Sequence, residues 1–147
     1  MKILIFIAVL LVLFSVESGY CAEPLPQTTN SIQQAYEELL AAKYFAFGGV
    51  GYAGSTSPGE RAFRAVLAST NALELFSSTL AKGTDAGKLY ALCGIRSLNK
   101  ISFDDSAKLL KKADPIVPTM SGCFASSEKA SSLIQQIANG TYDIHLK

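Results

Sequence analysis

The stretch that decides the fold runs from residue 57 to residue 115 and reads SPGERAFRAVLASTNALELFSSTLAKGTDAGKLYALCGIRSLNKISFDDSAKLLKKADP. It opens with Ser57, Pro58 and Glu60, which are typical of a capped helix start because the hydroxyl accepts a free backbone N–H and proline suits the first turn. Thr84 and Asp85 give a second start signal of this kind. Apolar residues follow at helical spacing, so the stretch predicts four helices that begin near residues 58, 72, 85 and 103.

Other residues in the stretch predict how these helices end and pack. Ser102 is expected to cap the fourth helix, with Asp105 at the position that completes a capping box. Asp114 and Pro115 should end this helix. In the third helix, Gly87 and Gly94 lie seven residues apart and therefore share a face, where another helix can approach closely.

The four expected helices form two consecutive pairs, whose caps Ser57 and Thr84 lie 27 residues apart. A succession of short antiparallel helix pairs resembles the units of HEAT-like solenoids, in which each pair covers its apolar face by stacking on the next pair. The resemblance rests on periodicity alone, and two units are fewer than a solenoid needs. The expected fold is therefore mainly α, either an irregular helical bundle or a short HEAT-like stack of helix pairs.

The segments on either side extend this fold. A capping box of Ser31 and Gln34 predicts a further helix from residue 32 to about residue 47. Residues 116 to 124 contain a proline and a glycine and are expected to form an extended crossover, followed by a helix that begins at Ser127. The tail alternates Tyr142, Ile144 and Leu146, a period of two that favours one short strand pairing with residues 116 to 119.

The N-terminal residues 1 to 21 are typical of a signal peptide. Lys2 precedes an uncharged run from residue 3 to residue 14, whereas a membrane span needs about 20 residues. Small residues at Gly19 and Cys21 predict cleavage before Ala22. The alternatives are acylation of Cys21 as a lipoprotein, which the bulky Tyr20 disfavours, and an uncleaved anchor.

The sequence thus divides into a signal peptide at 1–21, a flexible leader at 22–30 with two prolines, and a single helical domain at 31–147. The expected location is secreted or periplasmic. Under oxidising conditions Cys93 and Cys123 are predicted to form a disulfide that closes a loop of about 30 residues. Two free thiols, or a reactive thiol, remain as alternatives, although no C-x-x-C spacing supports a redox site.

Residues 48 to 56 contain four glycines within seven residues and are the most unusual segment of the chain. Backbone N–H groups in such a loop can converge on an anion, but the lysine and hydroxyl residue that end a nucleotide P-loop are missing. The simplest interpretation is a loop that needs positive φ angles or close backbone approach. The alternative is a binding loop, with candidate contacts at Gly49, Val50, Gly51 and Tyr52.

Composition narrows the function further. The formal net charge is +1, so no strong field is available to attract nucleic acid or an anionic membrane. The single histidine, His145, lies close to the end of the chain, where it is poorly placed for a catalytic triad, and no metal-type spacing of ligands occurs. No cofactor or metal is expected.

Two function classes remain. The first is an exported module that binds another protein, as an adaptor or inhibitor, through a helical face and the segment 48–56. The second is a small exported hydrolase with a carboxylate-based site. The hydrolase would need a cleft in which two carboxylates converge, or in which one carboxylate meets Arg61, Arg64 or Arg96. The oligomeric state is left open.

Overall fold

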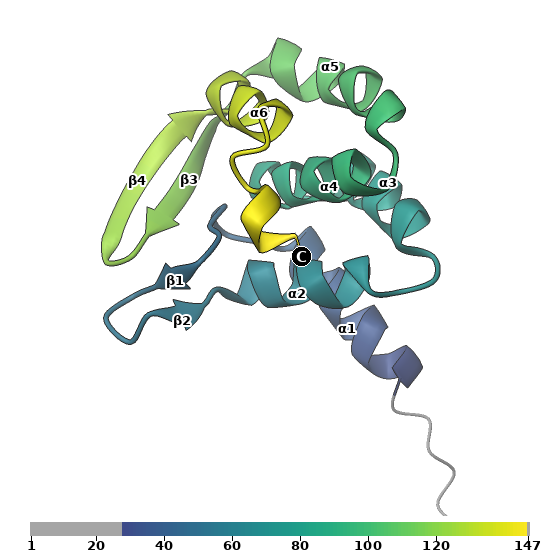
Figure 1. Cartoon of the computed structure of the whole chain (residues 1–147), viewed down its shortest axis with the longest axis horizontal. Helices are drawn as coiled ribbons and strands as arrows, with labels where there is room; N and C mark the ends of the chain where they lie inside the picture. The colour runs from purple at the N-terminus through teal and green to yellow at the C-terminus, as the bar shows by residue number, and fades with distance from the viewer. Residues whose placement is uncertain (1–27, 147) are drawn as a thin grey trace, which may run out of the picture.

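A computed structural model of the chain describes residues 28–146, so the predicted signal peptide and most of the predicted leader lie outside the described residues. The prediction of a mainly α domain is confirmed within this part of the chain (Figure 1). Its α-helices are α1 (Thr28–Leu40), α2 (Pro58–Leu67), α3 (Ala72–Lys82), α4 (Asp85–Leu98), α5 (Phe103–Ala113) and α6 (Ala130–Ala138). Two antiparallel hairpins and two short 3-10 helices complete it: β1 (Gly49–Val50) with β2 (Ser55–Thr56), β3 (Ile116–Ser121) with β4 (Phe124–Lys129), η1 (Lys100–Ser102) and η2 (Asp143–His145).

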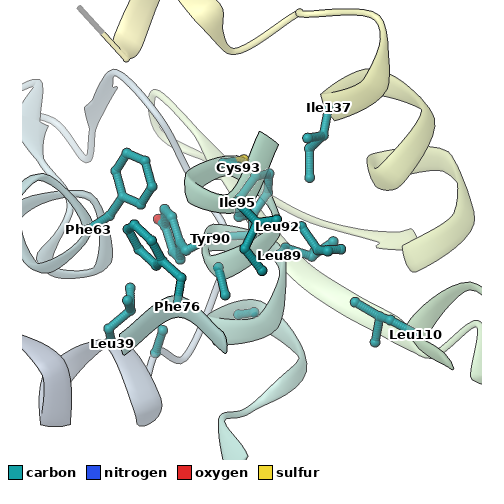
Figure 2. Close-up of a cluster of buried hydrophobic side chains, with 14 of the residues drawn as sticks. Leu39, Phe63, Phe76, Leu89, Tyr90, Leu92, Cys93, Ile95, Leu110 and Ile137 are labelled. Atoms are coloured by element: carbon teal, nitrogen blue, oxygen red, sulfur yellow. The ribbon is translucent and has the colours of Figure 1, made fainter. Parts of the chain in front are cut away.

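Helix α4 is the centre of the molecule. It contacts α1, α2, α3, α5 and α6, and nine of its residues, from Ala86 to Ile95, are buried. Figure 2 shows Leu89, Tyr90 and Leu92 of this helix among apolar side chains from its neighbours. A helix surrounded in this way belongs to an irregular bundle. The HEAT-like stack was therefore the wrong alternative, because its pairs would contact only the pairs beside them.

The four helix starts predicted within the central stretch are confirmed. Ser57 caps α2, its hydroxyl accepting from the N–H of Glu60, and Thr84 caps α4 by accepting from Gly87. The close-approach prediction is also confirmed. A Cβ at Gly87 would meet the backbone carbonyl of Leu39 in α1, and one at Gly94 would meet the ring of Phe76 in α3.

Two predicted caps are wrong. Helix α1 already begins at Thr28, so Ser31 lies inside it and the predicted leader overlaps its first turn. Ser102 makes no capping bond through its side chain, because it ends the 3-10 turn η1, where Asn99 accepts from its N–H. Helix α1 also ends at Leu40 rather than near residue 47, since residue 45 instead bonds to β3 through its backbone.

The C-terminal third contains a hairpin that the sequence reading did not predict. The extended segment from residue 116 is confirmed as β3, but its partner is β4 and not the tail. Ser127 therefore lies in a strand, and α6 begins three residues later at Ala130. The tail forms η2, and Asp143 in it pairs with Arg96 of α4. This tertiary ion pair opposes the extended conformation that the alternation favoured.

The predicted disulfide between Cys93 and Cys123 is wrong, because both thiols are free. Cys93 is buried in α4, whereas Cys123 is exposed in the turn of the β3–β4 hairpin, which projects from the bundle (Figure 1). Burial raises the pKa of the Cys93 thiol, which keeps it protonated and unreactive.

Candidate functional site

The tips of the two hairpins lie side by side (Figure 1). The N–H of Gly51 donates to the carbonyl of Gly122 at 2.8 Å, and the N–H of Gly122 donates to the carbonyl of Gly49 at 3.2 Å. These two bonds join turns that are about 70 residues apart in the sequence. We call residues 51–54 and 122–124 together the paired tips.

The four residues predicted as binding contacts have different environments at this site. Tyr52 is fully exposed, with a relative exposure of 102%. Val50 is instead buried, and it forms an isolated bridge with Gly122. Gly51 adopts a φ of 70°, and a Cβ at Gly49 would lie 2.9 Å from the carbonyl oxygen of Gly54. The interpretation as a loop that requires positive φ and close approach is confirmed, and Tyr52 is the one side chain of the four that projects outward.

The sequence reading missed the other half of the paired tips. Cys123 is exposed in the β3–β4 turn, and Phe124, the first residue of β4, is 81% exposed. Gly122 has a φ of 55° and holds the first of two turn positions, where a type II′ hairpin turn takes its glycine. The Gly-Cys pair between two strand-like segments is the sequence signal for this turn, whereas the expectation of one extended segment over residues 116–124 does not include it.

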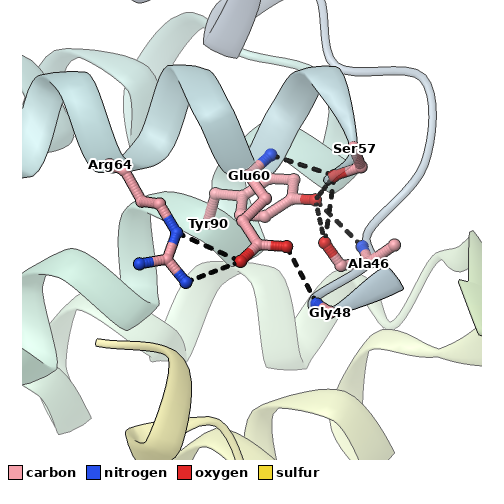
Figure 3. Close-up of polar contacts among 6 residues, drawn as sticks. All are labelled: Ala46, Gly48, Ser57, Glu60, Arg64 and Tyr90. Atoms are coloured by element: carbon pink, nitrogen blue, oxygen red, sulfur yellow. Dashed lines mark hydrogen bonds and ion pairs between the residues drawn. The ribbon is translucent and has the colours of Figure 1, made fainter. Parts of the chain in front are cut away.

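A buried polar network holds the chain where it enters the β1–β2 hairpin (Figure 3). The hydroxyl of Tyr90 donates to the carbonyl of Ala46 at 2.6 Å and accepts from the N–H of Ala46 at 2.9 Å. Ser57 also donates to this carbonyl, at 3.2 Å. Burial raises the pKa of Tyr90 to about 12, so the phenol stays protonated at neutral pH.

Glu60 extends this network to the first hairpin. One carboxylate oxygen accepts two bonds from Arg64, and the other accepts from the N–H of Gly48 at 2.8 Å (Figure 3). The Glu60 side chain therefore fixes the backbone just before β1. Both oxygens of this carboxylate therefore have partners within the fold, and these bonds give the pair with Arg64 a structural role.

A cavity of about 290 Å³ lies beneath the β3–β4 hairpin. Its walls come from the hairpin, from residues 45 to 47, from α6 and from Tyr142. One side is aromatic: the ring centroids of Phe45 and Phe47 lie 5.1 Å and 5.3 Å from that of Tyr142. His145 also stacks on the ring of Phe47, with centroids 5.5 Å apart.

Three of the residues that line this cavity are joined by a chain of hydrogen bonds. The Tyr142 hydroxyl donates to Gln136 at 2.7 Å, and the Gln136 amide donates to the Glu128 carboxylate at 3.0 Å. Burial raises the pKa of the Tyr142 phenol, with a smaller contribution from the negative charge of Glu128. The carboxylate is thereby held at the edge of an aromatic space.

Two other cavities lie between helices. One of about 350 Å³ is lined from α3, α4 and α5, and one of about 730 Å³ lies between α5 and α6. Each of the three cavities is lined by one carboxylate, namely Asp85, Asp104 or Glu128. None of the three contains the converging carboxylates, or the carboxylate beside Arg61, Arg64 or Arg96, that a hydrolase of the expected kind would need.

In the described residues, no group of histidine, cysteine or carboxylate side chains is arranged to hold a metal ion. No helix of this part of the chain has the length and apolar character needed to cross a membrane. No family model matches the chain, and neither a curated protein nor a solved structure is significantly similar to it.

Proposed function

We propose that this chain is an exported binding module that captures a protein partner through the paired tips. The observation that carries the proposal is the placement of two exposed aromatic side chains, Tyr52 and Phe124, on neighbouring turns that are joined by backbone hydrogen bonds. Aromatic residues dominate the energetics of protein interfaces because they bury a large area and lose little conformational entropy.

The anchoring of the tips supports this proposal. Glu60 fixes the backbone at Gly48, and the two bonds of Gly122 hold the second tip against the first. A surface held in place before binding loses less entropy on association than a mobile loop. Neither exposed ring contributes to the core, so their exposure is not required by the fold.

The export half of the proposal is supported by residues outside the described part of the chain. The charged start and the uncharged run of 12 residues from position 3 to position 14 fit a signal peptide. A location outside the cytoplasm would place the paired tips in contact with secreted or envelope proteins. Acylation of Cys21 would attach the module to a membrane without changing this surface.

The test replaces both aromatic residues with serine. The double variant Tyr52→Ser, Phe124→Ser should lose capture of the partner from the envelope or medium of the source cell, while its melting temperature stays within a few degrees of the wild type. The control is Leu109→Ser, which removes an 81% exposed apolar side chain on α5. Equal capture by the double variant would contradict the proposal, as would equal loss in the control.

A further inference from the structure

The face of the β3–β4 hairpin that lies over the cavity carries several polar residues. Its inward face comprises alternate residues on each strand, and the register places Thr119 opposite Ser126 and Val117 opposite Glu128. Val117 is buried, whereas Thr119 and Glu128 are half-buried and Ser126 is exposed, and these three polar residues line the 290 Å³ cavity. The hairpin side of the cavity is therefore polar and open to a ligand from solvent.

Glu128 is the one charged side chain among the residues that line this cavity. In the part of the chain that the structure describes, no lysine, arginine or histidine forms an ion pair with it. The neighbouring Lys129 lies on the other face of the strand and approaches Asp114 at 3.9 Å. The cavity thus presents a single negative charge without an internal counter-ion.

The other residues that line the cavity suit the hydrocarbon part of an organic cation. Phe45, Phe47 and Tyr142 form an aromatic wall, and the exposed Phe124 also lines the cavity. The aromatic rings can bury the carbon substituent of an organic cation, while the carboxylate attracts its ammonium group. Gln136 holds the carboxylate in place without neutralising its charge.

We propose that this cavity is a binding site for a small organic cation, with an ammonium group near Glu128 and its carbon substituent against the aromatic wall. The space of about 290 Å³ is sufficient for a benzyl or butyl group. The ammonium can belong to a free amine or to a lysine side chain of a bound peptide. The inference does not rest on the proposed function of the paired tips.

The experiment measures binding of benzylammonium to the mature protein by calorimetry and by amide chemical shifts, beside benzyl alcohol as the neutral analogue of similar shape. Benzylammonium should bind saturably, shift amides in residues 119–128 and near Tyr142, and bind about ten-fold more tightly than the alcohol. Glu128→Gln should remove this preference for the charged ligand. Asp105→Asn, which removes an exposed carboxylate from α5, is the control for net charge and should change nothing.

Two further measurements distinguish a free amine from a lysine side chain as the ligand, and the cavity proposal from the proposal for the paired tips. Saturable binding of Nα-acetyl-lysine methylamide shows that the cavity accepts a lysine side chain, whereas binding of benzylammonium alone identifies a site for free amines. Both outcomes support a cation site. Tyr52→Ser should leave amine binding unchanged, whatever it does to partner capture. Equal affinity for amine and alcohol, unchanged amine affinity in Glu128→Gln, or no saturable binding would overturn the inference.

Discussion

Tyr90 shows how a single residue positions the candidate site. Its ring is fully buried, and it contacts Phe45 and Phe47 at centroid distances of 4.9 Å and 5.3 Å. Its hydroxyl forms hydrogen bonds with both the N–H and the carbonyl of Ala46. The residue therefore connects the central helix to the segment that forms the aromatic wall of the cavity and leads into β1.

Removing this hydroxyl should destabilise the protein. Tyr90→Phe keeps the ring but leaves the N–H of Ala46, which is buried, without its partner. We expect the free energy of unfolding to fall by about 1 to 3 kcal/mol, as measured by urea denaturation. Tyr52→Phe, which removes a hydroxyl from an exposed ring, is the matched control and should change stability by less than about 0.5 kcal/mol. A loss of the same size in both variants would contradict this role.

The same hydroxyl predicts a dependence of stability on alkaline pH. Because burial raises the pKa of Tyr90 to about 12, while an unfolded tyrosine titrates near 10, the folded state holds this proton more tightly. Its contribution is complete below about pH 10 and should be lost as the pH rises towards 12. Denaturation at a series of pH values should show this fall, with a shallower slope in Tyr90→Phe. The slope should not vanish, since Cys93 and Tyr142 also have raised pKa values.

At the scale of elements, the contact between α3 and α4 depends on Gly94. Glycine normally weakens a helix interior, and alanine is better by about 1 kcal/mol. Here the space for a Cβ is taken by the ring of Phe76, which is itself fully buried. Steric overlap in a packed core costs about 1 to 3 kcal/mol, so it outweighs the gain in helix propensity.

Gly94→Ala is therefore expected to lower the midpoint of thermal unfolding. Ser97→Ala, at an exposed position of the same helix, should leave the midpoint unchanged or raise it slightly. Combining Gly94→Ala with Phe76→Leu should recover part of the loss, because the smaller side chain makes room for the methyl group. A stabilised Gly94→Ala variant would show that α3 and α4 do not pack this closely.

The hairpins are elements of a different kind, because they add little to the core. Glu60 and Tyr90 hold the entry to the first hairpin, and the bonds of Gly122 join the second to it. The bundle thus supplies a rigid support, while the turns supply the exposed aromatic residues. Such a division is common where binding residues lie on loops that a scaffold positions.

At the scale of the whole molecule, the proposal of export predicts a defined product. The exported protein should begin at Ala22, which intact-mass measurement would detect as the loss of residues 1–21. A mass corresponding to an acylated Cys21 would instead identify a lipoprotein. Finding the complete chain, with Met1, in the cytosol would contradict export.

The same measurement tests the thiols. Treatment with iodoacetamide before unfolding should modify Cys123, which is exposed, and leave Cys93 unmodified until the protein is denatured. The mass should be the same with and without reductant, because Cys93 and Cys123, the two cysteines within residues 28–146, are both free. A reductant-dependent shift of two hydrogens per molecule would contradict the free thiols of this structure.

The starts of the central helices could be predicted from the sequence because they depend on interactions between residues close together in the chain. Ser57 and Thr84 cap their helices through bonds to residues three positions away, and α3 begins at Ala72 as predicted, because these signals depend on neighbours in the chain. The prediction that Ser102 caps α5 was wrong because Ser102 instead ends a 3-10 turn, in which the Asn99 side chain accepts from its N–H. The prediction of a strand in the tail was wrong because Asp143 pairs with Arg96, a residue distant in the sequence.

For the candidate site, the sequence identified the unusual segment at residues 48–56 and its exposed Tyr52, since clustered glycines indicate special backbone conformations. Only the tertiary structure joined the turn that carries Tyr52 to the turn that precedes Phe124, buried Val50, left Cys93 and Cys123 as free thiols and brought Glu128 to the aromatic wall. Each of these facts depends on contacts between segments far apart in the chain. Local periodicity and spacing contain no record of such contacts, because they arise only when the bundle closes around α4.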